Sequence, residues 1–304
     1  MEVIPTMTAL YQVLSLFLLM MAGLGATRFR LLDDRGLKGL NTLVLYFAQP
    51  AMIAFRLQQD AEPQLITELV WVFVLTCVTI AIAGAISFAL FFREPPQRRS
   101  VLTNLAMVSN CGYMGYPVIT AALGDGALIY AVVFVAAFNL MCWTLGAYFY
   151  GGAKAMQPQR LLTNPSLIAI AAGLLLFFTG WRLPGFINNA LDMIGGVTTP
   201  VAMFVIGARL ISLRPAHLRD TKLLLMCLLR LIIFPSAILL LFLTPLPPMV
   251  VKSVFVCTAM PCAALTAMQS EVFDCDRDLA SRGVALSTAL SMATVPLMLL
   301  LLPA

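Results

Sequence analysis

The chain has 304 residues, of which 61% are hydrophobic and only 11% are charged, and its mean hydropathy is +0.94. Soluble domains carry about 25% charged residues, so a soluble enzyme is excluded, and so is a disordered chain. The net charge of +5 comes from short loops between apolar stretches and predicts no nucleic-acid partner. The composition therefore indicates a protein that crosses the lipid bilayer several times.

Apolar stretches long enough to cross a membrane as helices occur ten times, since about 20 residues are needed for each crossing. They lie at 4–26, 38–56, 67–92, 100–123, 126–150, 163–180, 187–211, 222–243, 249–273 and 280–302. The connections are short and leave no room for an inserted soluble domain.

Most of the 19 Lys and Arg residues lie in alternate loops, after the first, third, fifth, seventh and ninth stretches. Basic loops stay on the cytoplasmic side of a membrane. The sequence therefore predicts a multi-pass protein of the inner (plasma) membrane with both termini outside.

Two halves of five stretches each, residues 1–150 and 163–304, would insert in opposite orientations and form an inverted repeat. Prolines interrupt corresponding stretches in the two halves, at Pro50 and Pro200, and at Pro117 and Pro261. Proline removes one helical hydrogen bond, and a membrane tolerates the freed carbonyl only beside protein or a water-filled cavity. Matched interruptions favour a transporter binding site over ordinary kinks.

At these residues the sequence resembles the auxin efflux carrier family, over essentially the whole chain. The specific pieces are Ser109 to Pro117, followed by Gly124, Asp125 and Asn139, and 261–271, followed by Ser287, Thr288 and 291–296. The resemblance implies the fold of the bile acid sodium symporters, with broken fourth and ninth helices that cross. It also implies a scaffold of spans 1, 2, 6 and 7, a moving core of spans 3–5 and 8–10, an elevator motion and a homodimer.

The expected substrate site lies at the two broken helices, where the N-termini of the second halves carry partial positive charge. The family motif places Asn110 in this site. Beside it we expect the neighbouring residues of the two interruptions, namely Gly112, Tyr113, Gly115, Pro117, Pro261 and Cys262.

Two further polar residues lie deep in the apolar stretches and have two interpretations each. Asn139 could bind substrate or form a hydrogen bond between helices. Arg230 could attract an organic anion, since a charge at that depth indicates function. Alternatively, it could snorkel to the surface or bind the carbonyls freed by a broken helix.

A cation site is a weaker hypothesis, with Gln269 and Glu271 as candidates because the symporter relatives hold sodium near the corresponding span. The single histidine argues against a histidine metal site, and we expect no cofactor. No phosphate-binding loop of the Walker type occurs in the sequence.

These patterns together predict a secondary active transporter of a small organic anion, a mono- or dicarboxylate, and not an enzyme. The coupling ion could be a proton or sodium. A passive channel or facilitator is the alternative, because the same broken helices could line a pore.

Overall fold

The computed structural model describes residues 3–156, 159, 165–212 and 220–303, and nearly all of them are helical. Within those residues no β-strand forms, and the only bridge of the β type joins two single residues. The predicted all-α fold class is confirmed.

The first half of the chain contains helices α1 to α8. Their bounds are α1 Val3–Arg28, α2 Asp34–Leu43, α3 Gln49–Arg56, α4 Pro63–Leu90, α5 Pro96–Met107, α6 Tyr116–Leu123, α7 Leu128–Met141 and α8 Ala147–Gly151. The π-helical turns η1 Val44–Ala48, η2 Cys111–Gly115 and η4 Cys142–Gly146 join some of them into longer helices.

The second half contains α9 to α16. Their bounds are α9 Pro165–Thr179, α10 Gly185–Gly196, α11 Thr198–Arg209, α12 Thr221–Leu228, α13 Phe234–Ile238, α14 Pro248–Thr258, α15 Leu265–Val272 and α16 Arg277–Leu299. The π turn η9 Leu229–Ile233 connects α12 to α13.

Six helices of the described chain are long and apolar enough to cross a membrane. They are Tyr11–Arg28, Pro63–Leu90, Asp125–Ala155, Gly185–Arg209, Thr221–Leu243 and Arg277–Leu299. The chain is therefore a multi-pass membrane protein. Six of the ten expected spans are long and apolar enough as helices to cross the membrane.

The other four expected spans fall short for separate physical reasons. The second, 38–56, contains the polar residues Lys38, Asn41, Gln49 and Arg56, which lower its hydropathy. The sixth has only 15 residues as α9, and the fourth and ninth are each interrupted in the middle. The full set of ten spans and their inverted repetition thus stay predictions.

Each of the π turns η1, η2 and η9 stands directly before a helical segment with proline at its second position, Pro50, Pro117 or Pro235. Proline donates no hydrogen bond and its ring crowds the preceding turn. A widened turn accommodates the ring without ending the helix. Prolines at these positions therefore reshape the helices without breaking them.

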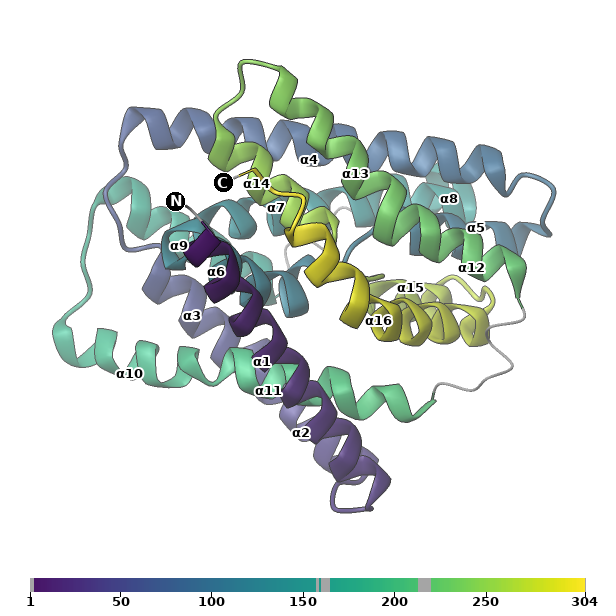
Figure 1. Cartoon of the computed structure of the whole chain (residues 1–304), viewed down its shortest axis with the longest axis horizontal. Helices are drawn as coiled ribbons and strands as arrows, with labels where there is room; N and C mark the ends of the chain where they lie inside the picture. Colours follow the sequence, from purple (N-terminus) through teal and green to yellow (C-terminus); the bar gives the residue numbers. More distant parts are fainter. Residues whose placement is uncertain (1–2, 157–158, 160–164, 213–219, 304) are drawn as a thin grey trace.

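Helix α1 packs on α11 along one side of the molecule, where the two helices cross (Figure 1). The contact is unusually close because of two glycines. A Cβ on Gly23 would stand 1.9 Å from the carbonyl oxygen of Phe204, and a Cβ on Gly207 would stand 1.8 Å from that of Met20. The small residues allow the two backbones to touch.

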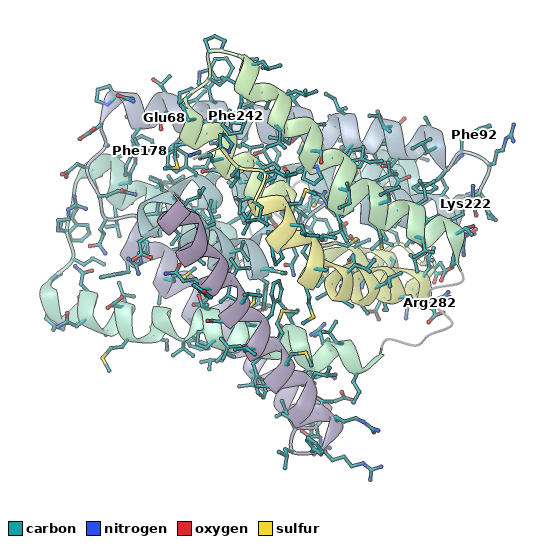
Figure 2. All side chains as sticks on the ribbon, viewed as in Figure 1. Glu68, Phe92, Phe178, Lys222, Phe242 and Arg282 are labelled. Carbon is teal, nitrogen blue, oxygen red and sulfur yellow. The ribbon has the colours of Figure 1, made fainter. Side chains whose placement is uncertain are left out.

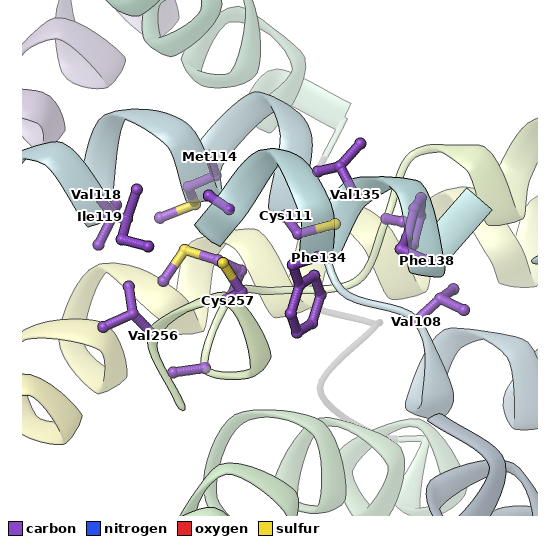
Figure 3. Packing of buried hydrophobic residues seen from close by; sticks show 14 of the residues in the cluster. Val108, Cys111, Met114, Val118, Ile119, Phe134, Val135, Phe138, Val256 and Cys257 are labelled. Carbon is purple, nitrogen blue, oxygen red and sulfur yellow. The ribbon is translucent and has the colours of Figure 1, made fainter. Parts of the chain in front are cut away.

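The long helix α4 lies on the opposite side and packs against α5, α7 and α14 (Figure 1). Buried side chains of α7 and α14 join those of the half-helix that begins at Cys111. Figure 3 shows Phe134 and Val135 of α7 and Cys257 of α14 around Cys111. This cluster packs around the site described below.

Charged side chains lie near both ends of α4. Figure 2 shows Lys222 and Arg282 at the end near Phe92, and Glu68 near the other end of α4. The first two residues are among those that the loop pattern assigns to the cytoplasmic side, so the fold keeps them together.

Candidate functional site

The helical backbone is interrupted twice near the middle of the bundle, between α5 and η2 and between α14 and α15. The two interruptions, 108–110 and 259–264, lie side by side, and we call this place the crossing. The N–H of Asn110 donates to the carbonyl oxygen of Pro261 at 2.7 Å, and that of Ala263 donates to the carbonyl oxygen of Val108 at 3.2 Å. Two segments about 150 residues apart thus satisfy each other's backbone groups, which a membrane interior requires.

Arg230, on the π turn η9, is buried beside this crossing. Its guanidinium donates to the carbonyl oxygens of Ala106 and Met107, both at 3.2 Å, and to that of Thr258. These oxygens belong to the last residues of the helices α5 and α14. Of the roles that the sequence left open for Arg230, the structure shows the contact with freed carbonyls.

The second half of each interrupted helix begins at the crossing. Residues from Cys111 to Leu123 form one continuous helix through η2 and α6, and α15 begins at Leu265. The first N–H groups of a helix have no partner within it and carry partial positive charge. Both N-termini therefore offer hydrogen-bond donors to an anion.

A cavity of about 930 Å³ adjoins these two N-termini. It is lined from both halves of the chain, by Thr27, Asp34, Leu37, Asn41, Leu45, Tyr46, Gln49, 109–113, Val135, Phe138, Asn139, Trp143, 205–206, 208–211, 263–265, 267–268, Ser281, 284–285 and Thr288. Such a volume and a mostly apolar lining with a few polar groups are typical of small-molecule sites.

Amide side chains supply the polar groups deep in the cavity. Asn110 is half-buried, and its side chain forms no hydrogen bond with the residues that the structure describes. Gln49 is 2% exposed, and its Oε1 has no partner within that same set. Asn139 donates from Nδ2 to the carbonyl oxygen of Val135 at 2.8 Å, one turn earlier in its own helix. Nδ2 of Asn110 can donate to a carboxylate, whereas Oε1 of Gln49 is an acceptor and can receive a hydrogen bond from an O–H or N–H group of a ligand.

Tyr113 links the interrupted helix to α2. Its hydroxyl donates to Oδ1 of Asn41 at 3.0 Å, and both residues line the cavity. Asp34 and Arg209, which are exposed, mark the opening at the end of the bundle where α2 begins and α11 ends. This end of the cavity therefore lies near the surface of the described structure.

Four of the predicted substrate residues line the cavity, namely Asn110, Gly112, Tyr113 and Asn139. The other five lie outside its lining: Gly115, Pro117, Arg230, Pro261 and Cys262. Of these, Pro261, Cys262 and Arg230 form hydrogen bonds at the crossing. The carbonyl of Pro261 accepts from Asn110, and the N–H of Cys262 donates to Oγ of Ser287 at 3.1 Å.

The two cation-site candidates are not brought together. Gln269 is buried and donates from Nε2 to the carbonyl oxygen of Cys142 at 2.9 Å. Glu271 is exposed and pairs with Arg277 at 3.4 Å. Within the described residues no group of three His, Cys, Asp or Glu side chains could hold a metal ion.

Sequence reasoning missed Gln49, Asn41 and Arg209 as cavity residues. Gln49 stands directly before Pro50, so the proline that marks the interruption also pointed to its neighbour. Asn41 and Arg209 gave no such signal, because a polar residue at the end of an apolar stretch is ordinary.

The residues of this site lie within a chain that matches one protein-family model almost throughout. The model described as "Membrane transport protein" matches residues 8–160 and 153–299. The chain belongs to this family. It is the auxin efflux carrier family, so the resemblance of the sequence is confirmed.

Among the similar proteins are two named as uncharacterized transporters. One, from Methanocaldococcus jannaschii, is 25% identical over 94% of this chain and 96% of its own length. The other, from Methanothermobacter thermautotrophicus, is 27% identical over 94% and 95%. A protein of Rhizobium meliloti named "Putative malonate transporter" is 25% identical over 90% of this chain and 89% of its own length.

Proposed function

We propose that this protein is a secondary active transporter of a small organic anion, a mono- or dicarboxylate of the size of malonate. The observation that carries the proposal is the cavity of about 930 Å³ at which two helix N-termini and the amide of Asn110 meet. Helix N-termini stabilise an anion without a fixed cation beside it. The name of the Rhizobium meliloti relative agrees with this substrate class.

In this proposal the carboxylate binds between the N-termini near Gly112 and Leu265, with Asn110 as a donor. Asn139 and Gln49 contribute amide groups on either side. The apolar walls, which include Val135 and Phe138, exclude water and enclose the carbon chain of the substrate. These groups can bind and release an anion by hydrogen bonds alone, which is what transport requires.

We also propose two inverted repeats of five spans, with both termini outside the inner membrane. The paired interruptions support the repeat, and the shared end of Lys222 and Arg282 supports the orientation. The cavity would then open to the cytoplasm. Spans 3–5 and 8–10 would move as an elevator against spans 1, 2, 6 and 7, within a homodimer, as the family resemblance implies.

Counterflow in proteoliposomes tests the proposal. Vesicles loaded with unlabelled malonate should accumulate labelled malonate transiently against its gradient, and Asn110→Ala should strongly reduce the accumulation. A passive channel gives no counterflow, so uptake that only equilibrates would favour the channel. A screen of mono- and dicarboxylates by the same assay identifies the preferred chain length.

A further inference from the structure

The crossing has a second polar centre, on the side opposite to the helix N-termini. The carbonyl oxygens of Ala106 and Met107 lie at the C-terminus of α5, and that of Thr258 lies at the C-terminus of α14. Helix C-termini carry partial negative charge. Two C-termini that meet inside a membrane are unfavourable unless a cation or donor stands between them.

Carbonyl oxygens at the ends of interrupted helices are the groups that hold sodium ions in many transporters. Here all three oxygens already accept hydrogen bonds from the guanidinium of Arg230. An arginine in a protein stays charged, and its planar donors can reach several acceptors together. The side chain is 2% exposed, so solvent does not screen this charge.

The local fold explains how the guanidinium reaches this point. Arg230 lies on the widened turn η9, five residues before Pro235. Beside it is a separate cavity of about 200 Å³, lined also by Ser109 and Phe134. The residue thus stands between the crossing and a small space, and does not line the large cavity.

We propose that Arg230 is a resident cation, which takes the place of a bound metal ion at the crossed C-termini, so that anion binding requires no sodium. This inference rests on the proposed function for the anion, but its structural part does not. The C-termini of the first half-helices and the N-termini of the second half-helices bind different groups. The N-termini bind the mobile anion, and the C-termini hold the fixed guanidinium.

The first test replaces sodium. Malonate affinity and the thermal unfolding midpoint of the purified wild-type protein should be the same in sodium chloride and in equimolar choline chloride. A malonate affinity that falls about tenfold or more without sodium would overturn the proposal. If malonate binds in neither salt, the substrate assignment fails, and the second test still decides on Arg230.

The second test removes the guanidinium and supplies it again. Arg230→Ala should lower the thermal midpoint, and methylguanidinium present from solubilisation onward should raise it by several degrees by mass action. Tetramethylammonium at the same concentration should not raise the midpoint, because it cannot donate hydrogen bonds. The control Arg93→Ala, in an exposed loop, should respond to neither ion. Equal effects of the two ions on Arg230→Ala would refute the resident guanidinium.

A second pair of variants serves if Arg230→Ala does not fold. Arg230→Lys retains a charge with fewer donors, and Arg230→Gln retains donors without a charge. We expect the lysine variant to be the more stable of the two. A glutamine variant as stable as the lysine variant would show that no cation is needed at this position.

Discussion

The backbone N–H of Asn110 donates to the carbonyl oxygen of Pro261 at 2.7 Å, so the two interrupted helices are joined at the residues that the family motif marks. This bond turns the backbone of Asn110 away from helical geometry, with φ −77° and ψ 55°. The side chain of Asn110 is thereby left at the cavity and is available to a ligand.

Asn110→Ala should therefore reduce malonate transport by about tenfold or more, the effect of losing a hydrogen bond to a charged group. Its thermal midpoint should stay close to that of the wild type, since the side chain has no described partner to lose. Uptake into proteoliposomes at matched protein content measures the first effect. The exposed Asn189→Ala is the control and should transport normally. Equal uptake by wild type and Asn110→Ala would remove Asn110 from the site.

Gln49→Leu separates binding from stability in a second way. The Oε1 atom of Gln49 is buried without a hydrogen-bond partner among the described residues, so its removal should cost little or no stability. If the amide binds the anion, transport should fall about tenfold. The comparison variant is Gln97→Leu, which changes an exposed glutamine. A large loss of midpoint with unchanged substrate affinity would assign Gln49 to packing alone.

Gly207→Ala should destabilise the protein through the contact of α1 with α11. The new methyl group would stand 1.8 Å from the carbonyl oxygen of Met20, so the helices must separate. Overpacking of this kind typically costs about 1–3 kcal/mol. Gly25→Ala on α1 is the matched control, because a Cβ there has no atom within 4 Å. Thermal unfolding in detergent should show a lower midpoint for Gly207→Ala only; equal midpoints would show that the two helices are not so close.

Asp220→Asn tests an ion pair outside the membrane-spanning segments. Asp220 is the N-cap residue directly before α12, and its carboxylate accepts from Arg98 at 2.6 Å. Burial raises the pKa of Asp220, but the hydrogen bonds from Arg98 and from backbone N–H groups outweigh it and lower the pKa below its usual value. The ion pair therefore stabilises the fold at neutral pH, by about 1 kcal/mol.

This stabilisation should be lost as the pH falls below the ordinary aspartate pKa of 3.8 towards the lowered value. The wild type should thus be more stable than Asp220→Asn at pH 7, and the difference should disappear in acid. Thermal midpoints measured across this range check the sign. Asp278→Asn, from the exposed pair with Arg282, should show a smaller effect at every pH. A difference that grows in acid would contradict the pair.

The sequence by itself determined the class of this protein and the places where its helices are irregular. Low charge and long apolar stretches exclude a water-soluble fold, because the charged residues are too few to cover a surface in contact with water. Proline within a stretch marks an interruption, as at Pro261, or a widened turn, as at Pro117, since proline cannot donate. Asn110 could be named as a candidate site residue from its motif alone, and it lines the cavity.

Only the tertiary structure decided which groups meet at those interruptions. Nothing in the local sequence states that Gln49 and Asn41 face the same cavity as Asn110, because their distance depends on how separate helices pack. The role of Arg230 was open for the same reason. Its partners are carbonyl oxygens of residues 106, 107 and 258, and backbone carbonyls leave no signature in a sequence.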